Sequence, residues 1–260
     1  MQAFKDHFSS NAAGYAAYRP SYPAALVDYL TSLLPRTMLA WDCACGTGQL
    51  SILLGDRFAR VIATDASAQQ IENAAPHPHV EYRVVPAECS GLPDANTDLI
   101  TVAQAAHWLP LEAFYTEVRR VACPDAVLAL ITYGVLHVEG QETDAVVQRF
   151  YYDLMGPYWP PERKHVENGY QSLPFPFREL QAPPLSMRMM WDLDAFIGYI
   201  HTWSSLREAE KVIGDEPMEA FRAELAEAWG NPATRRLVRW PLSLRVGRVE
   251  AAPFTANNLL

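Results

Sequence analysis

Short apolar segments alternate with amphipathic segments along the first half of the chain. Apolar runs predict β-strands at residues 38–43, 60–64, 80–85, 98–103 and 126–132. Helical spacing predicts helices at 49–54, 68–75 and 111–122. Runs that are apolar at nearly every position are typical of strands buried on both faces. The alternation of strand and helix therefore predicts an α/β fold with a doubly wound, mostly parallel sheet.

The two flanking regions have other patterns. Residues 1–35 carry aromatic side chains followed by helical spacing up to Leu33, which predicts an N-terminal helical flap. Residues 136–184 combine a helical stretch at 144–154 with many prolines, and prolines interrupt regular elements. We expect this segment to form a cap.

The last third of the chain returns to regular elements. It predicts strands at 185–191 and 237–246, a helix from Asp194 and another over 218–229. We therefore expect a single domain over 1–260, with a ligand-binding core at 36–135 and a C-terminal part at 185–250 that completes the sheet.

Composition narrows the possible partners. The chain has 260 residues, half of them hydrophobic, so it can bury a core and is not disordered. With 30 acidic against 21 basic residues, its net charge is −9, which disfavours nucleic acids and anionic membranes. No apolar run suits a membrane span, and the first residues lack the pattern of a secretory signal. We expect a soluble cytoplasmic protein with a small-molecule substrate; its oligomeric state is left open.

The cysteines and histidines do not form a metal-binding pattern. The four cysteines include Cys43 and Cys45, but no second pair follows at zinc-site spacing. His77 and His79 fall in a predicted loop. We therefore expect no metal cofactor and no disulfide framework.

The informative segment runs from Asp42 through Gly46 and Gly48 to Gln49. A strand that enters a glycine turn and opens a helix places backbone N–H groups at the carboxyl edge of the sheet, where ligands bind. Asp65 ends the next strand, 19 residues after Gly46. A carboxylate at that place can accept hydrogen bonds from both hydroxyls of an adenosine ribose.

Two common adenosine ligands do not match the segment. A dinucleotide fingerprint requires a third glycine where this chain has Ser51, and no phosphate-binding P-loop is present. Asp42 would repel a diphosphate, whereas it suits a ligand that carries an ammonium and a sulfonium. S-adenosylmethionine is such a ligand.

Asp42-x-Ala44-x-Gly46-x-Gly48 followed by Asp65 resembles the first two motifs of class I methyltransferases, with alanine at 44 where the family has glycine. Ala87-Glu88 is similar to the family's adenine-flanking loop, and residues 98–104 resemble the strand whose end touches the methionine part. The resemblance implies a seven-stranded Rossmann-like sheet and S-adenosylmethionine as cofactor. It also implies these cofactor-binding residues: Asp42, Ala44, Gly46, Gly48, Gln49, Asp65, Ala66, Ala87, Glu88 and Gln104.

Further segments resemble a narrower subgroup, the type 11 methyltransferases related to trans-aconitate methyltransferase. They include Tyr15-x-x-Tyr18-Arg19, His107-Trp108 and Thr202-Trp203. This likeness implies a flap whose Tyr15 and Arg19 close over the cofactor, with the Tyr15 ring attracted to a sulfonium. His107 is then the candidate general base. The candidate acceptor pocket contains Trp108, Trp159, Arg163, Tyr170 and Trp203.

Several residues also have structural interpretations. Asp65 could cap the helix that follows it, although Ser67 could do so instead. Glu88 could be a solvated loop acid, and His107 could line a pocket without moving a proton. Tyr15 and Tyr18 could pack against the first helix, and the candidate pocket residues could be scaffold aromatics and a surface arginine.

Three other functions share these motifs in whole or in part. The chain could consume S-adenosylmethionine as a cyclase or lyase, or bind it as a non-catalytic regulator. A nicotinamide oxidoreductase is a third alternative, which Asp42 and Ser51 disfavour.

Overall fold

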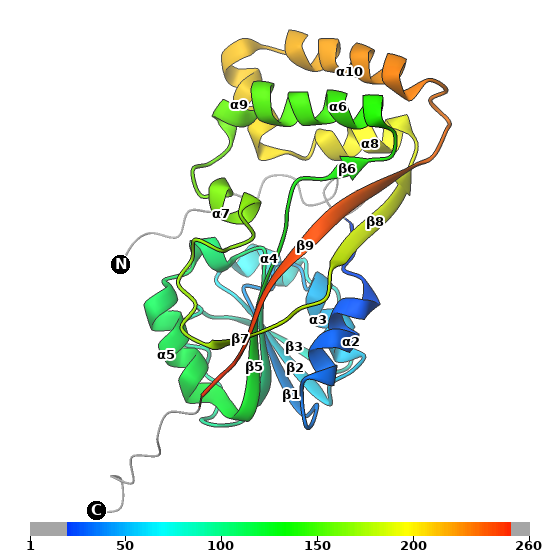
Figure 1. The fold of residues 1–260 in the computed structure, drawn as a ribbon. Helices are drawn as coiled ribbons and strands as arrows, with labels where there is room; N and C mark the ends of the chain where they lie inside the picture. The colour runs from blue at the N-terminus through cyan, green and yellow to red at the C-terminus, as the bar shows by residue number, and fades with distance from the viewer. Residues whose placement is uncertain (1–19, 251–260) are drawn as a thin grey trace, which may run out of the picture.

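The structure is a computed structural model that describes residues 20–250. Its strands form one sheet, with the main path β3-β2-β1-β4-β5-β9-β6 (Figure 1). The strands are β1 Leu39–Cys43, β2 Arg60–Asp65, β3 Val80–Val84, β4 Thr97–Ala103, β5 Ala122–Tyr133, β6 His137–Val138, β7 Arg178–Leu180, β8 Leu185–Trp191 and β9 Arg236–Arg248.

The first five strands are parallel, which confirms the predicted doubly wound α/β sheet. Strand β9 is antiparallel to β5. The main path contains seven strands, as expected, and two more, β7 and β8, pair with β9 beside that path. The additional pairing is possible because β9 is 13 residues long and has partners along its whole length.

The helices follow the predicted order, but α7 and α9 were not predicted and several bounds differ. They are α2 Ala24–Ser32, α3 Gln49–Gly55, α4 Ala68–Glu72, α5 Leu111–Val121, α6 Gln141–Arg149, α7 Arg163–Glu167, α8 Leu193–Ile200, α9 Ser204–Ile213 and α10 Glu216–Trp229. Helix α4 ends before Ala75 because Pro76 disfavours helical backbone at the preceding residue. Helix α6 continues as a π-helical turn, η2 Phe150–Leu154, and a short 3₁₀ turn, η3 Gly156–Tyr158, follows. Helix α9 was not predicted, although Leu206, Ala209 and Ile213 in it follow helical spacing.

The sheet is covered on both faces. Ala40, Leu99 and Val127 pack in the cluster that includes residues of α2 and α3. The neighbouring strand positions Trp41, Ile100 and Leu128 belong to a second cluster, which includes residues of α5. Adjacent positions on a strand point to opposite faces, so the continuous apolar runs supply both clusters.

Helices α6, α8, α9 and α10 lie together at one end of the sheet, above the core in Figure 1. We call this group of helices the cap. Strand β9 runs from the cap into the sheet, antiparallel to β5, so the carboxyl ends of the parallel strands face the cap. The placement of the domain boundary between residues 184 and 185 stays a prediction.

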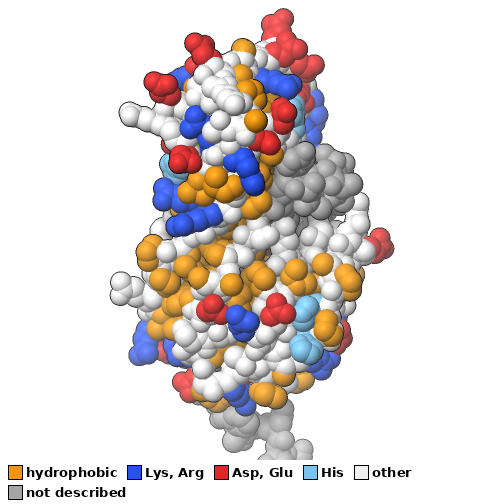
Figure 2. All heavy atoms as spheres, turned by 90° about the vertical axis from the view of Figure 1, so that its right-hand side faces the viewer, with side chains coloured by type: hydrophobic (Ala, Val, Ile, Leu, Met, Phe, Trp, Pro, Cys, Tyr) orange, Lys and Arg blue, Asp and Glu red, His pale blue; other side chains and the backbone are white. Residues whose placement is uncertain are grey.

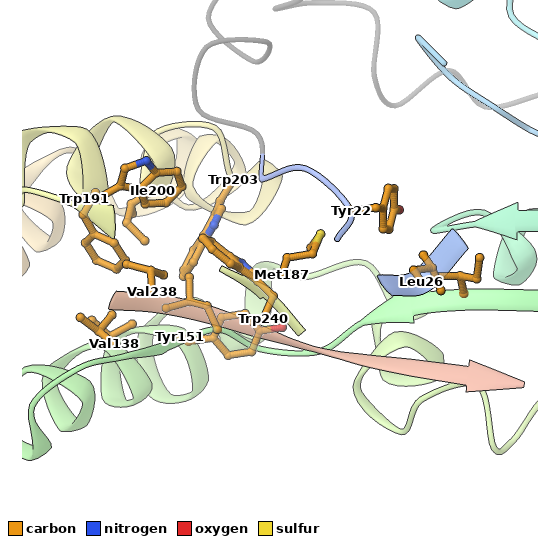
Figure 3. Packing of buried hydrophobic residues seen from close by; sticks show 14 of the residues in the cluster. Tyr22, Leu26, Val138, Tyr151, Met187, Trp191, Ile200, Trp203, Val238 and Trp240 are labelled. Atoms are coloured by element: carbon orange, nitrogen blue, oxygen red, sulfur yellow. The ribbon is translucent and has the colours of Figure 1, made fainter. Parts of the chain in front are cut away.

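One hydrophobic cluster joins the cap to the core. It extends from Leu26 in α2 through Met187 in β8 to Trp203 at the start of α9. Figure 3 shows Tyr151 and Trp203, whose rings are in contact, near β9 and its Trp240, with Met187 on the side toward Leu26. On the outside, hydrophobic side chains also gather where the molecule narrows between cap and core (Figure 2). Within residues 20–250, no helix is long and apolar enough to cross a membrane.

Candidate active site

The order of the strands reverses around β1. The chain leaves β1 for β2 and β3, then returns to β4 on the other side of β1. Ligands of open α/β sheets bind at such a reversal, outside the carboxyl ends of the strands. Ala44 and Gln104 follow β1 and β4 directly, and both adopt left-handed backbone with φ of 54° and 59°. This conformation costs roughly 1–2 kcal/mol for a residue with a side chain and is concentrated at functional sites.

An added β-carbon would clash at position 48 but not at position 46. Gly48 has φ of 81°, and a β-carbon there would lie 2.2 Å from Tyr82 Oη. Gly46 has φ of 56°, but the nearest atom to an added β-carbon is Gln70 Oε1 at 3.7 Å. The loop therefore packs closely against Tyr82 at Gly48 and keeps free space at Gly46.

Asp65 joins the end of β2 to this glycine loop. One carboxylate oxygen accepts a hydrogen bond from the Gly46 N–H and the other from the Ser67 N–H, both at 2.8 Å. A carboxylate oxygen has more than one acceptor site, so each can also accept a hydroxyl of a ribose. Ser67, whose Oγ accepts from Gln70 N, is the residue that caps α4. The residues at this edge therefore fit an adenosine ligand.

Asp42 is fully buried beneath the loop. Ser51 donates a hydrogen bond of 2.6 Å to one of its oxygens, and Thr101 donates one of 2.8 Å to the other. Burial raises the pKa of Asp42 to about 6, against the lowering effect of these two hydrogen bonds. The side chain thus links β1 to α3 and β4. Its contact with a cofactor ammonium stays a prediction.

Gln104 is attached to the neighbouring strand. Its Oε1 accepts a hydrogen bond from Thr132 Oγ1 at 2.9 Å, and its Nε2 donates to the Tyr133 carbonyl at 3.3 Å. These bonds connect the end of β4 to the end of β5, beside the glycine loop. The side chain therefore ties the ends of two neighbouring strands together at the carboxyl edge.

The other predicted cofactor residues lie around the same edge. Gln49 begins α3, and Ala66, which is exposed, follows Asp65. Ala87 is buried after β3, whereas Glu88 is exposed. Their contacts with a cofactor stay predictions. Tyr15 and Arg19 fall outside the described residues.

His107 lies just past the end of β4, in the short turn η1 Ala106–Trp108. Its Nδ1 is 2.9 Å from Tyr170 Oη, and its ring centroid is 4.7 Å from that of Trp108. Burial, together with the electrostatic effect of the nearby Arg163 and His165, lowers the pKa of His107 to about 4. The imidazole is therefore neutral at physiological pH.

Three of the predicted pocket residues meet under the cap. The guanidinium carbon of Arg163 lies 4.8 Å from the Trp159 ring centroid, and the Trp159 and Trp203 rings are 5.5 Å apart. Two further residues, Tyr151 and Tyr199, contact the Trp203 ring at 5.4 and 6.1 Å. We call these five residues the cap cluster.

The remaining two predicted pocket residues, Trp108 and Tyr170, lie with His107 instead. Tyr170 is completely buried, with its carbonyl accepting a hydrogen bond from Arg245. Sequence reasoning missed Tyr151 and Tyr199, although Tyr199 lies four residues before its partner Trp203; only the contact of Tyr151 with Trp203 is distant along the chain. A tyrosine on a predicted helix next to the proline-rich segment was the one available signal for Tyr151.

Known proteins resemble this chain over the core and the cap. Residues 41–130 match the family model described as a methyltransferase domain. A protein of Dictyostelium discoideum named as a methyltransferase is 33% identical over 229 residues, which cover 87% of each chain. A solved structure from Anaeromyxobacter dehalogenans, described as a type II methyltransferase, is 46% identical with a TM-score of 0.86. That match covers 90% of this chain and all of the other.

A more distant structure supports the fold alone. It is a methyltransferase from Anabaena variabilis, 18% identical with a TM-score of 0.52, and the match covers 86% of this chain and 98% of the other. The relatives do not single out the trans-aconitate subgroup, which stays a prediction. The edge built by the glycine loop and Asp65 fits the family's cofactor, S-adenosylmethionine. The chain therefore belongs to the class I S-adenosylmethionine-dependent methyltransferases.

Proposed function

We propose that this enzyme methylates a small molecule held between the carboxyl edge of the core and the cap cluster. The supporting observation is that the glycine loop with Asp65, and His107 after β4, lie at the same sheet edge, which faces the cap (Figure 1). His107 follows β4 at the edge, and the charge of Arg163 in the cap cluster lowers the pKa of His107. An acceptor between them would contact the cofactor edge on one side and the cap on the other.

The chain's own residues would align the reactants and exclude water, which is the main requirement of this reaction. When bound, S-adenosylmethionine supplies an electrophilic methyl group, whose bond to sulfur breaks in line as the acceptor's lone pair forms a new bond to carbon. Asp65 and the glycine loop would hold the adenosine. The aromatic rings of the cap cluster would keep solvent away from the acceptor.

His107 would accept the proton that a hydroxyl acceptor loses. When Nδ1 carries the ring proton and donates it to Tyr170 Oη, the lone pair of Nε2 is available. A pKa of about 4 keeps the imidazole neutral, and thus able to accept a proton, throughout the neutral range. The same low pKa makes it a weak base, so its main contribution would be to orient the hydroxyl.

The proposal is tested by following every product of the reaction. Purified protein is incubated with S-adenosylmethionine, with and without a panel of small carboxylic acids, phenols and amines, and the mixture is analysed by mass spectrometry. We expect S-adenosylhomocysteine to form only with an acceptor, together with an acceptor that has gained one methyl group.

Two outcomes would overturn the proposal. Formation of methylthioadenosine without an acceptor would show that the cofactor itself is the substrate of a cyclase or lyase. Tight cofactor binding with no turnover on any acceptor would instead indicate a regulator.

A further inference from the structure

A cavity of about 230 Å³ is lined in part by three residues of the cap cluster, Tyr151, Trp159 and Arg163. At ~30 Å³ for each water, it has room for roughly eight water molecules, which suits a ligand the size of one substituted aromatic ring. Its walls come from the π-helical turn η2, the proline-rich segment and α7. The lining residues are Tyr151, Tyr152, Gly156, Trp159, Pro160, Pro161, Arg163, Lys164 and Glu167.

Arg163 is the distinctive cation of this cavity. Its Nε donates a hydrogen bond of 2.8 Å to Tyr151 Oη, and its guanidinium lies over the Trp159 ring. It forms no ion pair with any carboxylate in residues 20–250, whereas Arg149 of the same cap pairs with Glu224. Because arginine stays protonated, its two terminal nitrogens can still grip an anion in a bidentate fashion.

The other charged groups of the wall do not cancel this cation. Glu167 accepts a hydrogen bond of 2.7 Å from Tyr151 Oη, so the tyrosine hydroxyl lies between the acid and Arg163. Lys164, which is exposed, adds a second positive charge. Two cations against one acid leave the cavity with a net charge of +1.

Trp159 contributes an aromatic wall. Its ring lines the cavity and lies against the Arg163 guanidinium. The cavity thus combines a guanidinium with flat aromatic walls.

We propose that this cavity binds the acceptor through a carboxylate, which Arg163 holds, while an aromatic ring of the acceptor packs against Trp159. The substrate class is therefore an aromatic monocarboxylate. This inference rests on the proposed methyl transfer to a small molecule and adds the chemistry that selects the acceptor. A neutral analogue would leave Arg163 without a counterion and bind more weakly.

Direct binding measurements test the inference without turnover. The probes are 4-hydroxyphenylacetate and its neutral isostere 4-hydroxyphenylacetamide, titrated by calorimetry into protein saturated with S-adenosylhomocysteine. We expect the carboxylate to bind at least about tenfold more tightly than the amide, as loss of one charged hydrogen-bonding partner predicts. Equal affinities would overturn the inference.

Variants separate the role of Arg163 from general effects on the cap. Arg163→Gln removes the charge and should abolish the preference for the carboxylate while leaving affinity for the amide unchanged. Arg163→Lys keeps the charge but not the fork of donors and should retain part of the preference. Arg149→Gln is the matched control in the same cap, and should behave like the unaltered protein. A carboxylate preference that persists in Arg163→Gln would overturn the assignment.

The affinity of Arg163→Gln for S-adenosylhomocysteine shows whether that variant is folded, and it should match that of the unaltered protein. Carboxylate binding without methyl transfer to any acceptor would contradict the proposed function and leave the cavity assignment standing. Methyl transfer to acceptors without a carboxylate preference would contradict the cavity assignment and leave the proposed function standing.

Discussion

The carboxyl edge of the core and the cap cluster build their sites in different ways. At the edge, each important polar side chain is tied to a neighbouring strand, loop or helix: Asp65 to Gly46, Asp42 to Ser51 and Thr101. In the cap cluster, aromatic rings and one guanidinium come from α7, α8 and the segments beside them, and Trp159 keeps an unused donor among the described residues. Strand pairing therefore determines the geometry of the edge, whereas side-chain packing determines that of the cap cluster.

This contrast matches the two tasks of a methyltransferase. A cofactor shared across a family can be held by a backbone arrangement that many sequences form. An acceptor that differs between enzymes is better recognised by side chains, because a substitution can change them without altering the sheet. Substitutions in the cap cluster should therefore change stability but not cofactor affinity, and substitutions at the edge should change cofactor affinity.

The largest expected effect is on the stability of the cap. Trp203 is buried against Tyr151, Trp159 and Phe150, so Trp203→Ala should lower the free energy of unfolding by about 3–5 kcal/mol. Urea unfolding measures this loss. Affinity for S-adenosylhomocysteine, measured on the folded variant, should stay within about twofold because the edge is independent.

Tyr152→Ala is the matched control, because that ring is 53% exposed and its loss should change stability little. A parallel fall in cofactor affinity in Trp203→Ala would contradict the separation of the two regions.

A somewhat smaller effect is expected at the edge. Asp65→Ala removes a carboxylate placed to accept two ribose hydroxyls, at about 1.5 kcal/mol or more for each bond. Affinity for S-adenosylhomocysteine, measured by calorimetry, should fall about 100-fold. Asp94→Ala, which alters an exposed acid paired with Arg120, should leave it unchanged. Normal affinity in Asp65→Ala would refute the assignment of the site, provided thermal unfolding shows both variants folded.

The smallest expected effect is the change in stability with pH that arises from His107, which lies between the edge and the cap cluster. His107 has a pKa of about 4 in the folded protein, below its ordinary value of about 6.5. Between these values the unfolded chain binds more protons, so the stability that His107 contributes above about pH 6.5 is lost as the pH falls toward 4. His107→Asn should reduce this loss, as measured by urea midpoints above about pH 7 and near pH 5.

Asp42 acts in the opposite direction. Its pKa is raised to about 6, so the stability that Asp42 contributes is present at low pH and is lost as the pH rises through that value.

His201→Asn, at an exposed position, is the control for the His107 variant. Equal acid sensitivity of His107→Asn and the unaltered protein would show that burial does not hold His107 neutral.

Much of the fold could be predicted because its signals are local. The strand predicted at 185–191 has the same bounds in the structure, and the glycine loop and Asp65 meet as the spacing indicated. Helix α9 was missed even though Leu206, Ala209 and Ile213 repeat at helical spacing. The hydrogen bonds of Asp42 with Thr101 and of Gln104 with Thr132 were not predicted either, because these partners lie 59 and 28 residues away.

The sequence by itself determined the parallel sheet, the cofactor edge and the family, since apolar periodicity and the glycine spacing act over a few residues. Only the tertiary structure decided which side chains meet beyond that edge. It placed Tyr170 beside His107, and it brought Tyr151 and Tyr199 against Trp203. The contacts of Tyr170 with His107 and of Tyr151 with Trp203 join distant segments, and no local pattern encodes them, because they arise when the whole chain buries its aromatic rings together.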